Sequence, residues 1–377
     1  MIEYKERLQK IRESGTYRSL QPTETEGKYV YVSGKKLLNL SSNDYLGLQE
    51  LSGLAEEYRQ SKEFRPMMSS SSARLLTGND RIYQELEQYL AAQYSVPSAL
   101  VWTSGFAANS GIIPSLADGE TLFLADRLIH ASMVEGLRLS SCRFARFEHN
   151  DVTRLRDLLE RNEGEYRHIW VLVESVYSMD GDVAPLADIV ALKRDFPSMR
   201  LYVDEAHSVG LYGHGFGLCA ELGLLTGVDL LVGTLGKALG SVGAYSLQSA
   251  SLRKIFISQA RPFIYTTALP PLMVGWSLFL LRKVREMEDR RVHLTEMRQR
   301  LGNRIGRTPE SQIISLEIPG EQKVAEAAED FMREGLYVRP IRKPTVPPGR
   351  ERLRISLTAA MTAEEIDHIG EVVRRWM

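Results

Sequence analysis

Two ionisable residues that follow apolar segments are the strongest candidates for chemistry in this chain of 377 residues. Asp204 ends the run RLYVD, and Lys237 follows the run VDLLVG in the glycine-rich segment GTLGKALG. A lysine in a partly desolvated cleft loses proton affinity and can attack a carbonyl. A carboxylate at a strand end can hold a metal, a ribose or a protonated ring nitrogen. Alone, Asp204 could cap a turn and Lys237 could be a solvated charge, but their joint presence favours a site.

Two further groups follow other apolar runs. Ser104, Gly105 and Phe106 stand where a strand would turn into a helix, so backbone N–H groups and the helix dipole could bind an anion there. Thr234 could add a hydroxyl from the lysine loop. His130, in ADRLIHAS, could stack on a planar ring. Ser104 could instead be a simple N-cap, and His130 could be structural.

One cofactor, pyridoxal phosphate, needs all four groups: a phosphate anchor, a carboxylate for a ring nitrogen, a lysine for an aldehyde and a flat ring for stacking. Its protonated ring absorbs the electrons of a substrate carbanion. No GxGxxG follows a predicted strand and no GxxxxGK[ST] occurs, which argues against dinucleotide and nucleoside-triphosphate sites. We therefore expect pyridoxal phosphate between Lys237 and Asp204.

These residues must be positioned by one open sheet, because ligands of α/β sheets sit at the carboxyl ends of the strands. Short apolar runs alternate with helical segments such as VTRLRDLLERN, which predicts a mainly parallel sheet with helices on both faces. GAYSL is a candidate for one antiparallel strand. The other expected strands are SALVWT, TLFLAD, CRFARF, HIWVLVES, RLYVDEAH and VDLLVGT.

The alternation of short apolar runs and helical segments is absent before and after the predicted sheet. We expect an N-terminal arm over residues 1–45 with a charged helix and the hairpin YVYVSGKK, a large α/β domain over 46–271, and a small α+β domain over 272–377. A single long charged helix, SLFLLRKVREMEDRRVHLTEMRQRLGNR, should lead into the last part. The final helix should begin after Thr362 as its N-cap.

Composition narrows the class of protein. The chain is 44% hydrophobic and 25% charged with a net charge of −1, as in a globular protein without the concentrated basic surface that nucleic acid requires. Its start lacks the apolar core of a signal peptide, and the apolar stretch 268–281 is short for a membrane span. Cys142 and Cys219 form neither a disulfide framework nor a zinc motif. We expect a cytoplasmic protein without metal, nucleic acid or membrane partner.

Nine motifs resemble the α-oxoamine synthase family of fold-type-I pyridoxal-phosphate enzymes. The resemblance extends from about Asn39 to Thr362 and implies an α/β fold with a mainly parallel seven-stranded sheet and a smaller C-terminal domain. The motifs, in chain order, are SSNDYLGL, ARLLTGN, TSGFAAN, ADRLIHAS, ESVYSMDGDVAPL, VDEAHSVG, GTLGKALG, IYTTALPP and TVPPGRERLRISLT.

The resemblance implies a role for each matching residue at the cofactor. Lys237 would form the Schiff base, Asp204 would pair with the pyridinium nitrogen, and His207 would lie near the ring hydroxyl. As a hypothesis on the mechanism, His207 is the favoured general acid near the thioester or the ring oxygen. The other implied cofactor contacts are Gly105 and Phe106 through their backbone, stacked His130, Ser178 near the ring hydroxyl, Thr234 at the phosphate, and Thr266 or Thr267 at the phosphate of the other subunit.

The resemblance also implies the substrate side. Arg354 would hold the amino-acid carboxylate by a bidentate fork, with Asn43 beside it. Arg342 and Thr345 would line the acyl side. Because one of the two threonines would serve the partner's site, the active unit is expected to be a homodimer.

Family members join an amino acid to an acyl thioester and release carbon dioxide. SSNDYLGL, SMDGDVAPL and TVPPG are most similar to the members that use alanine and a pimeloyl thioester, of coenzyme A or acyl carrier protein, in biotin synthesis. Two alternatives stay open. The chain could resemble members that use glycine or serine, or it could catalyse another fold-type-I reaction such as transamination. A non-catalytic scaffold subunit is a further alternative, against which Lys237, Asp204 and His207 together argue.

Two departures from the family pattern lie where the acyl chain or the partner subunit should approach. Ser69–Ala73 replaces the usual glycine-rich stretch before Arg74, and Tyr83 stands where a histidine is frequent. They leave the acyl donor less well defined than the cofactor.

Overall fold

The computed structural model describes residues 2–14 and 16–377, which divide into two compact units. We call Leu51–Ser178 with Asp182–Arg291 the sheet unit. We call Met1–Glu50, Met179–Gly181 and Val292–Met377 the terminal unit. The finer division into an arm, a large domain and a small domain stays a prediction.

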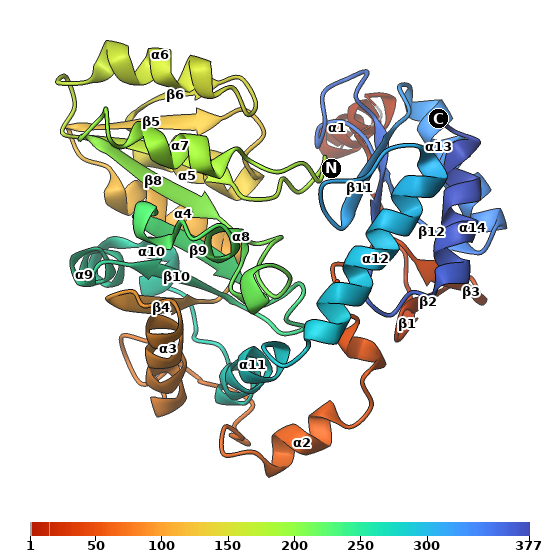
Figure 1. Ribbon diagram of the computed structural model, residues 1–377, viewed down its shortest axis with the longest axis horizontal. Coiled ribbons are helices and arrows are strands. Elements are labelled where there is room, and N and C mark those ends of the chain that lie inside the picture. Colours follow the sequence, from red (N-terminus) through yellow and green to blue (C-terminus); the bar gives the residue numbers. More distant parts are fainter. Residues whose placement is uncertain (1, 15) are drawn as a thin grey trace. The chain divides into compact units, whose positions relative to one another are not determined.

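The sheet unit is built on a seven-stranded sheet with the strand order β4-β10-β9-β8-β7-β5-β6 (Figure 1). β10 is antiparallel to both of its neighbours, and β9, β8, β7, β5 and β6 pair in parallel. This confirms the mainly parallel α/β sheet and its one antiparallel strand. The strands are β4 (Ser98–Trp102), β5 (Thr121–Asp126), β6 (Arg143–Phe147), β7 (His168–Glu174), β8 (Met199–Asp204), β9 (Leu230–Thr234) and β10 (Ala244–Gln248).

Apolar side chains on one face of this sheet form a large core with the helices that cover it. Phe123 and Tyr202 from the strands pack in one cluster with Ile112 of α4 and Met133 of α5. Complete burial of such a side chain contributes about 1.5–3 kcal/mol relative to exposure. The helices of the sheet unit are α2 (Leu54–Gln60), α3 (Arg81–Gln93), α4 (Gly105–Leu116), α5 (Ala131–Ser140), α6 (Val152–Asn162), α7 (Leu186–Leu192), α8 (Leu218–Glu221), α9 (Ala250–Gln259), α10 (Arg261–Ile264) and α11 (Pro271–Val284).

The register of the central strands aligns their carboxyl ends. Glu174, the last residue of β7, pairs with Asp204, the last residue of β8, and Asp204 pairs with Val232 of β9. The turns that follow these strands therefore open at the same edge of the sheet, as the sequence predicts.

The terminal unit contains two small sheets, with strand orders β1-β2-β3-β12 and β11-β14-β13. The predicted hairpin is confirmed as β2 and β3, and Thr362 begins the last helix with a capping box to Glu365. The elements are α1 (Ile2–Glu13), β1 (Glu24–Glu26), β2 (Tyr29–Val32), β3 (Lys35–Asn39), α12 (Glu288–Ile305, whose first turn belongs to the sheet unit), β11 (Ile313–Glu317), α13 (Glu321–Arg333), β12 (Leu336–Tyr337), β13 (Pro340–Ile341), β14 (Arg352–Ser356) and α14 (Ala363–Arg374).

The single long helix predicted to begin near residue 277 is wrong. The chain forms α11 up to Val284 and a separate helix, α12, from Glu288. Arg291 explains the break, because its guanidinium donates to the carbonyl oxygens of Val284 at 2.7 Å and Arg285 at 3.1 Å. These carbonyls belong to the last residue and the C-cap of α11, where side-chain donors can replace the helical bonds that are missing.

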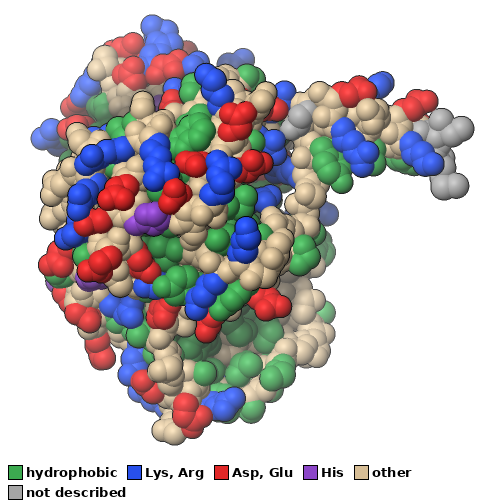
Figure 2. Space-filling model, turned by 90° about the vertical axis from the view of Figure 1, so that its right-hand side faces the viewer, with side chains coloured by type: hydrophobic (Ala, Val, Ile, Leu, Met, Phe, Trp, Pro, Cys, Tyr) green, Lys and Arg blue, Asp and Glu red, His purple; other side chains and the backbone are tan. Residues whose placement is uncertain are grey.

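Charged side chains of both signs are interspersed on the face of the molecule in Figure 2. Within the described residues, no helix is long and apolar enough to cross a membrane. Among the same residues, no group of three or more His, Cys, Asp or Glu side chains is placed so that it could hold a metal ion.

Candidate active site

The predicted lysine and histidine contact each other. Nζ of Lys237, in the loop between β9 and β10, lies 2.7 Å from Nε2 of His207, in the turn after β8. His207 is buried, whereas Lys237 is partly exposed. One nitrogen of this pair must carry the shared proton. The pair can therefore move a proton between the amine of Lys237 and the imidazole of His207. The partial exposure of Lys237 leaves its amine accessible to a ligand.

Asp204 is buried and its carboxylate is held in a fixed orientation. Oδ2 accepts a hydrogen bond from Nδ2 of Asn109 at 2.7 Å, and Oδ1 accepts one from the backbone N–H of Ala206 at 2.9 Å. The side-chain oxygen of Asn109 in turn accepts a hydrogen bond from the hydroxyl of Tyr202. Sequence reasoning missed Asn109 as a site residue, although it ends the motif TSGFAAN.

His130 belongs to the same hydrogen-bonded chain as Asp204. It is the N-cap of α5, and its Nδ1 lies 2.7 Å from the hydroxyl of Ser132. That hydroxyl accepts from Nδ2 of Asn109 at 2.9 Å. The residue as a whole remains exposed. A ring that is fixed at one nitrogen and exposed to solvent is suited to stacking on a planar ligand.

Ser104 is the N-cap of α4, which is the simpler of the two roles predicted for it. Its hydroxyl accepts from the N–H of Ala107 at 3.0 Å at the start of α4. The helix begins at Gly105, where an added Cβ would meet no atom within 4 Å. The backbone therefore faces open space at a helix N-terminus, which is favourable for a phosphate. Thr234, whose hydroxyl donates to the carbonyl of Gly243 at 3.2 Å, lies in the strand that leads to Lys237.

These groups fit pyridoxal phosphate. The open space at Gly105 would take the phosphate, the fixed carboxylate of Asp204 would take the ring nitrogen, and Lys237 would bind the aldehyde. Ser178 lies buried in the turn after β7, at the same edge of the sheet. The role of each residue toward the cofactor stays a proposal.

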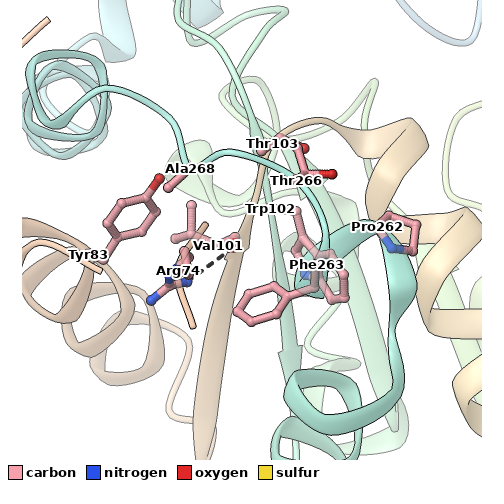
Figure 3. A pocket seen from close by; sticks show the side chains of 9 residues that line it. All are labelled: Arg74, Tyr83, Val101, Trp102, Thr103, Pro262, Phe263, Thr266 and Ala268. Atoms are coloured by element: carbon pink, nitrogen blue, oxygen red, sulfur yellow. Dashed lines mark hydrogen bonds between the residues drawn. The ribbon is translucent and has the colours of Figure 1, made fainter. Parts of the chain in front are cut away.

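A small cavity lined by Thr266 contains one of the two departures from the family pattern (Figure 3). Arg74 stacks on Tyr83 with its guanidinium 4.1 Å from the ring centre, and it pairs with Glu87 at 2.5 Å. The free volume is about 10 Å³, too small for an acyl chain. Tyr83 therefore fills this place as a packing residue.

Both departures contact one backbone carbonyl. The hydroxyls of Tyr83 and Ser70 donate to the oxygen of Leu269 at 3.1 and 2.6 Å. Leu269 closely follows Thr266 and Thr267, and Thr267 forms a β-bridge with Ala73. The departures thus hold the segment that carries the two threonines. Whether a threonine reaches the partner subunit stays a prediction.

In the terminal unit, Arg354 and Asn43 are in contact, as the prediction that Asn43 lies beside Arg354 requires. Nη2 of Arg354 donates to Oδ1 of Asn43 at 3.2 Å and to the hydroxyl of Tyr45 at 3.1 Å. Nη1 donates to the hydroxyl of Ser356 at 2.8 Å. Arg354 is 8% exposed, and these hydroxyl and amide partners orient its guanidinium in a largely desolvated place. Such an arginine is suited to a carboxylate ligand.

Arg342 and Thr345, the residues expected on the acyl side, line a cavity of about 350 Å³ in the terminal unit. Arg18 lines it too, and its Nη2 donates to the hydroxyl of Thr345 at 3.0 Å. Arg339 and Lys343 add two more cations to the lining. Sequence reasoning missed Arg18 because no motif or strand end marks it.

Residues 35–373 match the family described as aminotransferase class I and II. The chain belongs to this family. A protein from Haemophilus influenzae, provisionally named 8-amino-7-oxononanoate synthase, is 43% identical over 97% of this chain and 98% of its own. A protein of the same provisional name from Neisseria meningitidis is 43% identical over 96% and 97%.

Solved structures of related enzymes place the chain more closely. Serine palmitoyltransferase from S. paucimobilis superposes with a TM-score of 0.88 at 28% identity, over 99% of this chain and 96% of that one. 8-Amino-7-oxononanoate synthase from Francisella tularensis does so with a TM-score of 0.74 at 25% identity, over 90% and 97%. The chain is thus an α-oxoamine synthase, as its motifs predict: a fold-type-I, pyridoxal-phosphate-dependent acyltransferase.

Proposed function

We propose that the enzyme condenses L-alanine with a pimeloyl thioester to give 8-amino-7-oxononanoate, carbon dioxide and free thiol, in cytoplasmic biotin synthesis. The provisional names of relatives that are 43% identical over nearly the whole chain support this assignment. The single structural observation that carries it is the cationic cavity at Arg18, Arg342 and Thr345.

A pimeloyl chain differs from a fatty acyl chain because the end away from the thioester is a free carboxylate. Arginine recognises carboxylates through paired N–H donors, and a cavity with cationic lining strengthens that recognition. The guanidinium of Arg18 is already oriented by the hydroxyl of Thr345, so less side-chain entropy is lost on binding. A palmitoyl chain, named in the structural relative, offers no charge to this lining.

The amino acid would be held by its carboxylate at Arg354. Asn43, Tyr45 and Ser356 accept hydrogen bonds from that guanidinium and help to orient it. The preference for alanine itself follows from the relatives and the motifs.

The chain's own residues would move the protons of the reaction. Bound pyridoxal phosphate supplies the electron sink for the carbanion at the α carbon. The amine of Lys237, once released from the cofactor, would take the α proton and later return one to the same carbon after decarboxylation. His207, at 2.7 Å from that amine, would donate a proton near the thioester oxygen. Asp204 would hold the proton on the ring nitrogen by its charge.

We also propose a homodimer with shared sites. Large apolar side chains that are well exposed in one chain support this, because a partner would cover them. Three lie near the threonine segment: Met68 and Leu76 at 77% exposure and Tyr265 at 72%. Light scattering of the purified protein should give twice the mass of one chain.

A substrate screen tests the proposed reaction. The purified enzyme is given glycine, alanine or serine with acyl thioesters of graded length, with and without a terminal carboxylate. Release of carbon dioxide and free thiol should be greatest with alanine and the pimeloyl thioester. Preference for serine with a long fatty acyl thioester would instead favour a serine palmitoyltransferase. The screen includes coenzyme A and acyl carrier protein thioesters, because the carrier is open.

A further inference from the structure

A histidine outside the predicted site is placed between two carboxylates, one at the end of β5 and one in the turn after β7. His149 follows β6, and its Nδ1 lies 2.9 Å from Oδ1 of Asp126, the last residue of β5. Its Nε2 contacts Oδ2 of Asp182, in the turn after β7. Each ring nitrogen of His149 faces a carboxylate oxygen. The protonated imidazole, with two N–H donors and one positive charge, is therefore the form that these two carboxylates favour.

The next residue, Asn150, donates hydrogen bonds to the same two aspartates. The backbone N–H of Asn150 donates to Oδ2 of Asp126 at 2.8 Å, and its side-chain amide donates to Oδ2 of Asp182 at 3.1 Å. Asn150 has φ +56°, a left-handed conformation that asparagine tolerates better than most residues. His149 and Asn150 together connect the end of β5 with the turn after β7 through charge and hydrogen bonds.

The two aspartates belong to the turns that carry two predicted cofactor residues, Asp126 through its carboxylate and Asp182 through its backbone carbonyl. Oδ1 of Asp126 also accepts from the N–H of Leu128 at 2.7 Å, in the turn that leads to His130. The carbonyl of Asp182 accepts from the N–H of Tyr177 at 3.0 Å and closes the turn that contains Ser178. The ring of Tyr177 lies edge-on to His149, with ring centres 4.4 Å apart.

We propose that His149 is a positioning residue that fixes the turns of His130 and Ser178 relative to each other and so sets the binding geometry of the cofactor. This inference rests on the proposed cofactor roles of those two residues. His149 would act through the turns and contact neither the cofactor nor the substrate. If His149 only stabilised the fold, its replacement would lower the unfolding temperature but would not change the rate at which the folded holoenzyme loses its cofactor.

The experiment compares holoenzymes of wild type, His149→Gln, Asp182→Asn and the double variant. Each is dialysed against a thiol amine that traps released pyridoxal phosphate, well below its unfolding temperature, and the visible absorption of the bound cofactor is followed. Groups that orient the ligands of a bound metal typically contribute about 10- to 100-fold to metal affinity, and we take the lower end of that range for turns that hold a cofactor. We expect each single variant to lose the cofactor about tenfold faster. The double variant should be no faster than His149→Gln, because that change already removes the contact with Asp182.

His168→Gln is the matched control, because His168 begins β7 at the opposite end of the same sheet. Its holoenzyme should lose cofactor at the wild-type rate. Wild-type cofactor loss in His149→Gln, or rate increases that multiply in the double variant, would overturn the proposal. If His149→Gln does not fold, Asp182→Asn alone decides, because it keeps the imidazole. The readout involves no acyl substrate, so a wrong substrate assignment leaves the result intact.

Discussion

The amine of Lys237 lies 2.7 Å from Nε2 of His207, within direct proton-transfer distance. The two residues come from different strand ends, after β9 and β8, and meet only because the strands pair in parallel. Lys237 is therefore the residue whose loss should be most damaging. The Lys237→Ala holoenzyme should lack the visible absorption of a covalently bound cofactor and nearly all turnover. Lys254→Ala, at an exposed lysine, is the control; residual turnover above a few per cent of wild type in Lys237→Ala would argue against the assignment.

Loss of His207 should affect chemistry more than binding. His207→Gln removes the general acid but keeps a polar side chain, so kcat should fall by about 10²- to 10⁴-fold with little change in KM. Steady-state kinetics with alanine and a pimeloyl thioester measure this. His214→Gln, at an exposed histidine, should behave as wild type. An unchanged kcat in His207→Gln would remove the residue from the mechanism.

Replacement of Asp204 by asparagine should keep the shape of the site and remove its charge. The ring nitrogen would then lose its protonation, and kcat should fall by at least about 10²-fold, as when a preorganised electrostatic partner is removed. The absorption spectrum of the bound cofactor should change with it. Asn109→Ala, which frees Oδ2 of Asp204 from its 2.7 Å hydrogen bond, should cause a smaller loss of the same kind. Full activity of Asp204→Asn would contradict the pairing.

Arg18 should discriminate between acyl chains. A hydrogen bond to a charged group is worth about 1.5–3 kcal/mol, so Arg18→Gln should raise KM for the pimeloyl thioester by about 10- to 100-fold. KM for a chain of equal length without the terminal carboxylate should stay the same, because that chain never used the charge. Lys35→Gln in the exposed hairpin controls for net charge. Equal effects on both thioesters would place the terminal carboxylate elsewhere.

The contribution of His149 to stability should depend on pH. Burial alone would lower the pKa of His149, but hydrogen bonds and charges of Asp126 and Asp182 outweigh it and raise the pKa to about 10 from an ordinary value of 6.5. A raised pKa stabilises the fold fully below the ordinary value, and this stabilisation is lost as the pH rises toward 10. The unfolding-temperature difference between wild type and His149→Gln should therefore be larger at pH 6 than at pH 10. A difference that grows with pH would show that the imidazole is not the charged form.

Much of the sheet and of its strand-end residues could be predicted because both leave local signals. Apolar runs mark the strands, and a polar or titratable residue directly after each run marks the ligand edge, as for Asp204 and Lys237. Asn109 and Arg18 could not be found in this way, because their partners Asp204 and Thr345 are distant in sequence. The break between α11 and α12 was missed because the helical pattern continues through it, while the Arg291 side chain binds the carbonyls that end α11.

The central claim is that the cofactor is bound through Lys237. The most direct test is reduction of the holoenzyme with borohydride, followed by proteolysis and mass spectrometry of the peptides. The cofactor should be found on the peptide that contains GTLGKALG, at Lys237 and nowhere else. Its recovery on another lysine, or complete release of the cofactor after reduction, would contradict the account.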